Sequence, residues 1–148
     1  MAGHYGAMPG VVSYQIYNEP HYPANGTFDY HPLAIEGFRK WLEEQGGVPG
    51  MEKIKSAKAK LLYDVLDSSK LYIPHAQKDS RSDMNVTFRT GSDELDEKFV
   101  KEATALGFVN LKGHRSTGGM RASIYNAMPI EGVEKLAAFM RDFEARHI

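Results

Sequence analysis

Residues 112–126 bring together three glycines, one histidine and two arginines, in the order Lys-Gly-His-Arg-Ser-Thr-Gly-Gly-Met-Arg-Ala-Ser-Ile-Tyr-Asn. Glycine allows tight turns and a close approach of the backbone to a ligand. Arginine presents a planar fork that binds a carboxylate or a phosphate through two hydrogen bonds. His114 and Arg115 stand at one end of the expected turn and Arg121 at the other, so the two arginines can face one ligand with two anionic groups. The spacing does not fix that ligand; a phosphate together with a carboxylate suits it.

The elements that must position this loop follow from the spacing of apolar residues. Over 84–89, apolar and polar side chains alternate, which predicts a half-buried strand. Ser92 is a favourable first residue for a helix, and Gly107 is a favourable residue to end it. The same reasoning predicts helices over about 32–45, 51–67, 93–106 and 130–146, and strands over 71–73, 84–89, 108–111 and 121–125.

From residue 71 the predicted order is strand, strand, helix, strand, strand, helix. Helices laid on one face of a small, mostly antiparallel sheet give an α+β fold, a two-layer sandwich. The composition changes near residue 32, so we expect two parts. Residues 1–31 form an irregular N-terminal extension with one strand over 11–17, and residues 32–148 form the folded domain.

Composition narrows the class of protein. The chain has 148 residues, a net charge of -1 and no cysteine. The near-neutral charge argues against nucleic acid and anionic membranes as partners. Without cysteine there are no disulfides, thiol nucleophiles or thiolate metal sites, which suits a reducing compartment. No apolar run is long enough to span a bilayer and no signal peptide is visible, so we expect a cytoplasmic protein.

Three weaker patterns have structural interpretations. The six histidines show no ligand spacing, so no metal site is predicted. The lysines at positions 53, 55, 58 and 60 form a charge run that favours a solvent-exposed helix face. Trp41 lies on the apolar side of its helix and is expected in the core.

Residues 113–129, Gly-His-Arg-Ser-Thr-Gly-Gly-Met-Arg-Ala-Ser-Ile-Tyr-Asn-Ala-Met-Pro, resemble the C-terminal signature of the phosphoserine aminotransferase family. The resemblance runs back through 84–89 and 40–47 and forward to 144, so it covers about residues 40–148. It implies the small, C-terminal domain of a fold-type I aminotransferase that depends on pyridoxal phosphate. It also implies a role in serine biosynthesis and a homo-oligomer.

The resemblance assigns roles to individual residues. His114 and Arg115 match the family's pair at the substrate phosphate, and Arg121 matches the arginine that binds the α-carboxylate. The implied ligand is a small anion of the phosphoserine or phosphohydroxypyruvate type. Asn18, in Tyr-Asn-Glu-Pro, matches an asparagine that reaches the cofactor phosphate of a partner subunit, although Glu19 stands where the family has threonine.

One part of the family pattern is missing from this sequence. The Schiff-base lysine of the family lies in a Gly-Ala-Gln-Lys-Asn type motif, and no such motif occurs here. No residue is therefore assigned a catalytic role, and we expect that this chain alone does not transaminate.

A second resemblance involves the N-terminal segment. Residues 9–20 and 38–42 resemble part of a (β/α)₈-barrel glycosidase of the β-galactosidase type, in which the glutamate matching Glu19 is the general acid/base. Such a barrel needs about 250 residues and a second carboxylate, so this chain cannot supply it. Two hypotheses about the whole chain remain. It is a truncated or recombined piece of the aminotransferase, or it is a non-catalytic, engineered or recombined chimeric domain with a role in structure or self-association.

Overall fold

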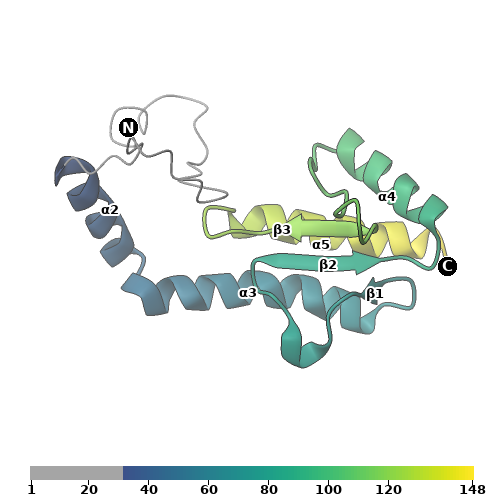
Figure 1. The fold of residues 1–148 in the computed structure, drawn as a ribbon, viewed down its shortest axis with the longest axis horizontal. Coiled ribbons are helices and arrows are strands. Elements are labelled where there is room, and N and C mark those ends of the chain that lie inside the picture. Colours follow the sequence, from purple (N-terminus) through teal and green to yellow (C-terminus); the bar gives the residue numbers. More distant parts are fainter. Residues whose placement is uncertain (1–31) are drawn as a thin grey trace. The chain divides into compact units, whose positions relative to one another are not determined.

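A computed structural model describes residues 32–148 of the chain (Figure 1). The chain forms two compact units that divide between Lys53 and Ile54. The first unit contributes helix α2 (Pro32–Glu44) and the first turns of helix α3 (Gly47–Ser68). The predicted strand over 11–17 lies outside the described residues, as do Asn18 and Glu19. The predicted boundary between residues 31 and 32 therefore stays a prediction.

Helix α2 begins at Pro32, as the sequence predicts, but it contributes no buried residue. Trp41 is 43% exposed, and its ring stacks on Phe38 with 6.1 Å between the ring centroids. The prediction that Trp41 lies in the core is wrong. The apolar side of α2 forms a local aromatic contact within the helix instead of entering a packed interior.

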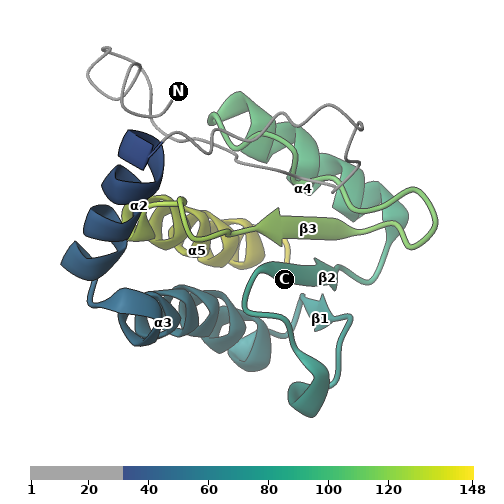
Figure 2. The ribbon, with the colours of Figure 1, turned by 60° about the vertical axis from the view of Figure 1, so that its left-hand side comes forward.

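The second unit contains a three-stranded antiparallel sheet in the order β1 (Ile73–Pro74), β2 (Asn85–Arg89) and β3 (Met120–Ser123). Helices α4 (Asp93–Ala105) and α5 (Ile130–Ala145) complete it, with a short 3₁₀ turn at Lys78–Ser80. Figures 1 and 2 show α3 and α5 together on one face of the sheet. This confirms the predicted α+β fold with helices on one face. No helix among residues 32–148 is long and apolar enough to cross a membrane.

Five aromatic rings form the centre of the core. Phe99 of α4 contacts Tyr72, Phe88, Phe139 and Phe143, with ring centroids 5.0–5.8 Å apart. All five side chains are buried. Edge-to-face pairs of this kind add about 0.5–1.5 kcal/mol each beyond the apolar area that they bury. The core therefore ties α4 and α5 to the inner face of β2.

The turn after β2 is fixed by a capping network at the start of α4. The Ser92 hydroxyl accepts a hydrogen bond from the Leu95 amide at 3.1 Å, which confirms the predicted helix start. The buried Asp96 carboxylate accepts from the Thr90 amide at 2.6 Å and from the Thr90 hydroxyl at 2.7 Å. These bonds hold the backbone immediately after Arg89, the last residue of β2.

The predicted strand over 108–111 is wrong. Gly107 and Asn110 adopt positive φ angles of 89° and 61°, which turn the backbone out of the extended conformation. The chain rejoins the sheet only at an isolated bridge between Lys112 and Met120. Leu111 is still buried, so the apolar residues that suggest a strand pack against the core from an irregular segment.

One lysine of the run on α3 departs from the solvent-exposed face that the sequence predicts, while Lys53 and Lys60 are exposed. Lys58 is fully buried, while Lys60 is exposed and pairs with Asp64. The Lys58 ammonium donates hydrogen bonds to three carbonyl oxygens of the segment between β3 and α5: Tyr125 at 2.7 Å, Met128 at 2.9 Å and Asn126 at 3.4 Å. Burial lowers the pKa of Lys58. This lysine is part of the fold rather than of the solvated surface.

Candidate functional site

The strand register brings three site residues into one row across the sheet. Thr87 of β2 lies directly opposite Arg121 of β3. On the other side of β2, the His75 amide donates to the Thr87 carbonyl oxygen at 3.1 Å, which extends the pairing of β1 by one residue. The neighbouring row, Phe88 and Met120, is buried under the helices. Because side chains alternate along strands, the row of His75, Thr87 and Arg121 belongs to the opposite, open face.

The glycine-rich loop is a tight hairpin that leads into β3. Its stem is closed by the Gly113 amide bonding to the Gly119 carbonyl at 2.8 Å, and its tip by the Gly118 amide bonding to the His114 carbonyl at 2.8 Å. A Cβ atom on Gly113 would lie 2.0 Å from the Gly118 carbonyl oxygen. Gly119 has φ 65°, and a Cβ there would lie 2.6 Å from the Phe88 carbonyl oxygen. Glycine is therefore required for the hairpin to lie against the end of β2.

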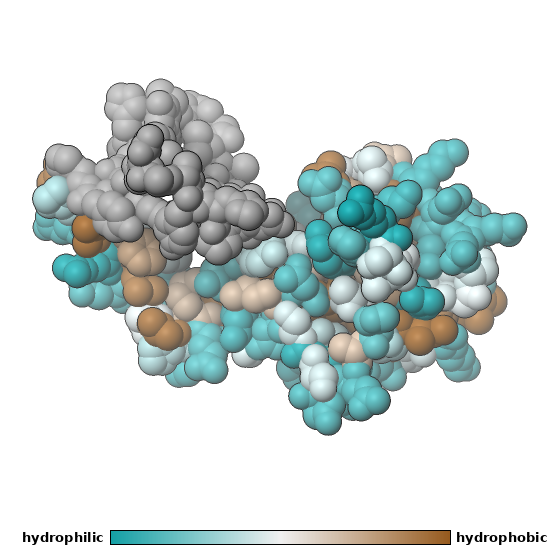
Figure 3. All heavy atoms as spheres, in the orientation of Figure 1, coloured by the Kyte–Doolittle hydropathy of each residue, from teal (hydrophilic) through white to brown (hydrophobic). Residues whose placement is uncertain are grey.

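A small pocket of about 50 Å³ lies between this hairpin and the ends of β1 and β2. Four basic side chains line it: those of His75, Arg89, His114 and Arg121. The remaining lining residues are Thr87, Phe88, Gly113, Thr117, Gly118 and Met120, so no carboxylate takes part. Figure 3, which has the same orientation as Figure 1, shows mainly hydrophilic colours over the region of the strands and the hairpin. The arrangement suits a small anion.

Hydrogen bonds within the pocket hold the hairpin but leave its cations available. The Arg89 Nη2 donates to the Thr117 carbonyl oxygen at 3.0 Å. The His114 Nδ1 lies 2.7 Å from the Ser116 hydroxyl. Arg115 and Arg121 form no side-chain hydrogen bond or ion pair with another described residue. Elsewhere, by contrast, Arg81 binds the Asp67 carboxylate through two hydrogen bonds.

The structure brings two of the three predicted anion-binding residues together. His114 and Arg121 both line the pocket, while Arg115 is exposed on the hairpin next to His114 and does not line it. Sequence reasoning missed His75 and Arg89. The alternation over 84–89 places Arg89 on the polar side of its strand, which is the one local signal for it. His75 has no such signal, because only the pairing of β1 with β2 brings it here.

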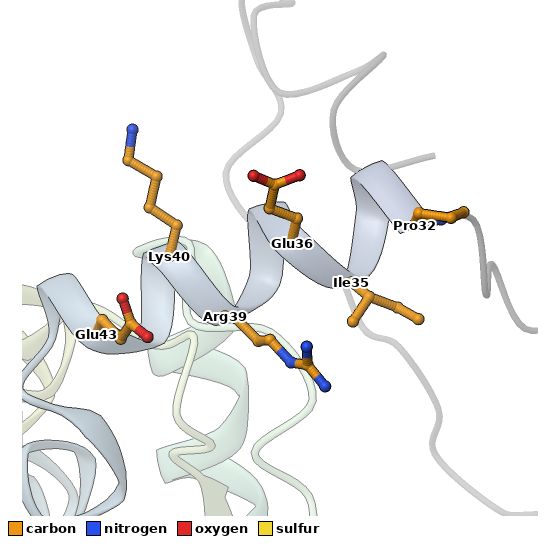
Figure 4. Close-up of a pocket in the computed structure, with 6 residues that line it drawn as sticks. All are labelled: Pro32, Ile35, Glu36, Arg39, Lys40 and Glu43. Carbon is orange, nitrogen blue, oxygen red and sulfur yellow. The ribbon is translucent and has the colours of Figure 1, made fainter.

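A larger hollow lies beside α2, and Figure 4 shows the six residues that line it. All six come from this one helix. In Figure 4 the Lys40 and Arg39 side chains extend in different directions, so their charges do not converge on a common ligand position. Within residues 32–148, no group of three His, Asp or Glu side chains is placed to hold a metal ion.

The described residues do not fit a pyridoxal phosphate site. A pocket of about 50 Å³ is well below the roughly 300–1,000 Å³ usual for small-molecule sites. No lysine lines it to form a Schiff base. The buried ammonium of Lys58 is held by three carbonyl oxygens and is fully inaccessible. The pocket is therefore too small for a cofactor ring and offers no lysine to bind one.

Comparison with known proteins gives a consistent relationship. Residues 9–136 match the family Aminotransferase class-V. The chain is 58% identical over 141 residues to a phosphoserine aminotransferase of Histophilus somni and 48% identical over 140 residues to one of Janthinobacterium sp. (strain Marseille). Each alignment covers 94% of this chain but only 39% and 38% of the respective relative. The chain thus spans less than two fifths of the length of these curated relatives.

Solved structures agree. The phosphoserine aminotransferase of Bacillus circulans subsp. alkalophilus superposes with a TM-score of 0.72 at 51% identity, over 74% of this chain and 30% of that one. A pyridoxal phosphate-bound phosphoserine aminotransferase from Trichomonas vaginalis gives a TM-score of 0.64 at 38% identity, over 69% of this chain and 30% of that one.

The same comparisons bear on the N-terminal segment. The family match already begins at residue 9, within the stretch that resembles a glycosidase. An alignment with the phosphoserine aminotransferase of Listeria monocytogenes covers 97% of this chain. The glycosidase resemblance finds no support. Homology to phosphoserine aminotransferase extends over most of the chain, well beyond the predicted start near residue 40.

Proposed function

Since this chain belongs to the class-V aminotransferase family, we propose that its basic pocket binds the substrate of a phosphoserine aminotransferase that depends on pyridoxal phosphate and acts in serine biosynthesis. His114 and Arg115 bind the phosphate of phosphoserine or phosphohydroxypyruvate, and Arg121 binds the α-carboxylate. The observation that carries the proposal is a pocket lined by His114 and Arg121 and by no carboxylate.

Chemistry at the substrate amine belongs to the cofactor, which supplies the electron sink for amino transfer when it is bound. The residues described here orient the substrate. Two anionic groups held at fixed positions leave the substrate little freedom to turn, which is how positioning accelerates a reaction. We also propose that the chain alone does not complete transamination, because no described lysine reaches the pocket.

The test is a calorimetric titration of the chain with O-phosphoserine, L-serine and inorganic phosphate. Phosphoserine should bind more tightly than either of the others, because only it engages both anion positions. Arg121→Gln should weaken phosphoserine binding about tenfold and phosphate binding much less, since a charge-assisted hydrogen-bonded contact of this kind is worth about 1.4 kcal/mol or more.

Arg141→Gln is the matched control, because Arg141 is exposed on α5 and does not line the pocket. Equal affinities for the three ligands, or an Arg121→Gln variant that binds phosphoserine like the wild type, would contradict the proposal. Adding pyridoxal phosphate should produce no absorption band of a lysine aldimine; such a band would contradict the statement that the chain alone is incomplete.

Self-association is the second candidate, and exposed apolar side chains favour it. Val48 of α3, Leu106 and Val109 after α4, and Ile148 at the end of the chain are each 65–71% exposed. Exposed apolar side chains that form one contiguous patch commonly lie in contacts between proteins, and Leu106 and Val109 are three residues apart in the chain. Sedimentation velocity over a tenfold range of concentration tests this proposal: a concentration-dependent increase in mass supports it, and a constant monomer mass contradicts it.

A further inference from the structure

We propose that His75 and Arg89 are additional anion-binding residues, and that they contact a single oxyanion of the substrate in the pocket that His114 and Arg121 also line. The occupant is the phosphate or carboxylate group of a small acid. This rests on the proposed function in that the oxyanion is part of the substrate. It adds His75, which directly follows β1, and Arg89 of β2 to a site that the sequence places entirely within residues 112–126.

The position of His75 follows from the sheet. Its amide bonds to the Thr87 carbonyl oxygen, and Thr87 lies opposite Arg121, so the three residues cross the sheet in one row. Only the backbone of His75 takes part in this pairing. No hydrogen bond holds its ring within the described part of the chain, and the ring lines the pocket. The imidazole is therefore available to a ligand on the open face.

Arg89 reaches the pocket from the end of β2. Its guanidinium carries five N–H donors, and only one bond, from Nη2 to the Thr117 carbonyl oxygen at 3.0 Å, is made within the described residues. That bond aims the planar group towards the hairpin. Gly119, whose lack of a Cβ lets it lie against the Phe88 carbonyl oxygen and the Arg89 side chain, brings the hairpin close enough for the bond to form. The remaining donors make no bond within the described residues, and no carboxylate lines the pocket beside Arg89.

The charges of this cluster differ in their partners from those of two other arginines among the described residues. Arg81 is bound to Asp67, and Arg146 is bound to Glu102 and Asp142. The arginines that line the pocket have no such partner among residues 32–148. The chain as a whole carries a net charge of -1, so this local excess of cations does not reflect a basic protein. Clustered cations without acidic partners repel one another, and a bound anion removes that cost.

The size of the pocket limits its occupant. About 50 Å³ exceeds the roughly 10–15 Å³ that a cavity needs in order to hold one water molecule, but it is far too small for a whole amino acid. A single phosphate or carboxylate group fits this description. The substrate would then enter by one anionic end, with the rest of the molecule extending outward along the open face.

The experiment titrates the 148-residue chain with inorganic phosphate and, separately, with acetate, by calorimetry and by NMR of the histidine ring protons. His75→Gln is the cleaner variant, because His75 contributes to the fold through its backbone amide. Arg89→Gln is the second variant, and Arg141→Gln is again the control. Unfolding temperatures without ligand are measured for all of them.

We expect His75→Gln and Arg89→Gln each to weaken phosphate binding by about fivefold to tenfold, the range for the loss of one charge-assisted contact at an exposed site. Arg141→Gln should leave binding unchanged, and the His75 ring protons should shift when phosphate is added. If acetate binds with the same losses and phosphate does not, the oxyanion is a carboxylate and the proposal stands.

Wild-type affinity in both pocket variants would overturn the proposal, as would the absence of binding by both anions. A weakened Arg89→Gln with unchanged His75→Gln and a lowered unfolding temperature would assign Arg89 to the hairpin alone, and would also overturn it. Failure of the proposed function has a different result: phosphoserine binds no better than phosphate, while both pocket variants still lose phosphate.

Discussion

Lys58 of α3 contacts the segment that follows β3, and Arg121 lies near the start of β3. The charged groups of these two residues have opposite surroundings. After β3 ends, the carbonyl oxygens of Tyr125, Asn126 and Met128 receive all three donors that an ammonium offers. Before and at the start of β3, by contrast, the Arg115 and Arg121 side chains form no hydrogen bond or ion pair with another described residue, and Arg121 lines the pocket.

The difference separates a charge that stabilises the fold from charges that the described residues leave unpaired. A buried cation must be fully hydrogen-bonded, because leaving it in a low-dielectric interior without partners is costly. Exposed cations are solvated by water and need no internal partner. We call the end of β3 next to Lys58 its anchored end, and the end next to the hairpin and Arg121 its open end. Substitutions at the anchored end should change stability, and substitutions at the open end should change binding.

The largest effect is expected for Lys58→Met. The change leaves three carbonyl oxygens beside an apolar side chain, and it should lower the free energy of unfolding by about 3 kcal/mol, since an unsatisfied buried polar group costs roughly 1–3 kcal/mol. Urea denaturation measures it. Lys60→Met is the matched control on the same helix; its exposed pair with Asp64 contributes only about 0.3–0.5 kcal/mol. Similar losses in the two variants would contradict the assignment of Lys58 to the fold.

An intermediate effect is expected for Gly119→Ala, which acts on the open end through the backbone. Alanine at φ 65°, with its Cβ 2.6 Å from the Phe88 carbonyl oxygen, should lower the free energy of unfolding by about 2 kcal/mol. It should also weaken phosphate binding, because the hairpin would move away from Arg89. Gly91→Ala is the control: nothing lies within 4 Å of its added Cβ. If Gly119→Ala retained full stability and binding, this would contradict the close contact between Gly119 of the hairpin and the Phe88 carbonyl oxygen.

The smallest effect concerns Asp67, whose partner Arg81 represents a third case, a cation paired with a carboxylate. Arg81 lowers the pKa of Asp67 to about 2, from an ordinary value near 3.8. A carboxyl whose pKa is depressed by folding stabilises the protein above its unfolded pKa, and this stabilisation is lost as the pH falls. Asp67→Asn should therefore be less stable than the wild type at pH 6, and the difference should disappear between about pH 4 and pH 2. A difference in urea midpoints that stays constant over this range would contradict the role of the carboxylate.

Much of the fold can be predicted from local sequence. The alternation over 84–89 and the capping residue Ser92 correspond to β2 and the start of α4, because both signals depend on neighbouring residues. The segment over 108–111 misleads for the same reason. Its apolar residues satisfy a strand pattern, while the positive φ of Asn110 depends on how the chain returns to the sheet.

The residues of the candidate site also divide into those that local sequence predicts and those that it does not. The glycines, His114 and the arginines of the hairpin are contiguous, so their chemistry is visible in the sequence. His75 and Arg89 reach the pocket only through the pairing of three strands, and Lys58 meets carbonyl oxygens 67–70 residues away in the chain. A run of lysines predicts a solvent-exposed helix face. The burial of Lys58 could be predicted only with knowledge of its distant carbonyl partners.

The two backbone bonds that close the hairpin also affect the entropy of binding. Gly113 and Gly118 have already lost their conformational freedom when the protein folds, through bonds of 2.8 Å to Gly119 and His114. An arriving anion therefore has to immobilise side chains but not a loop, and each ordered side chain costs only about 0.5–1.5 kcal/mol. Weak individual contacts with an anion can then add up to useful affinity, because no binding free energy is spent on ordering the backbone of the hairpin.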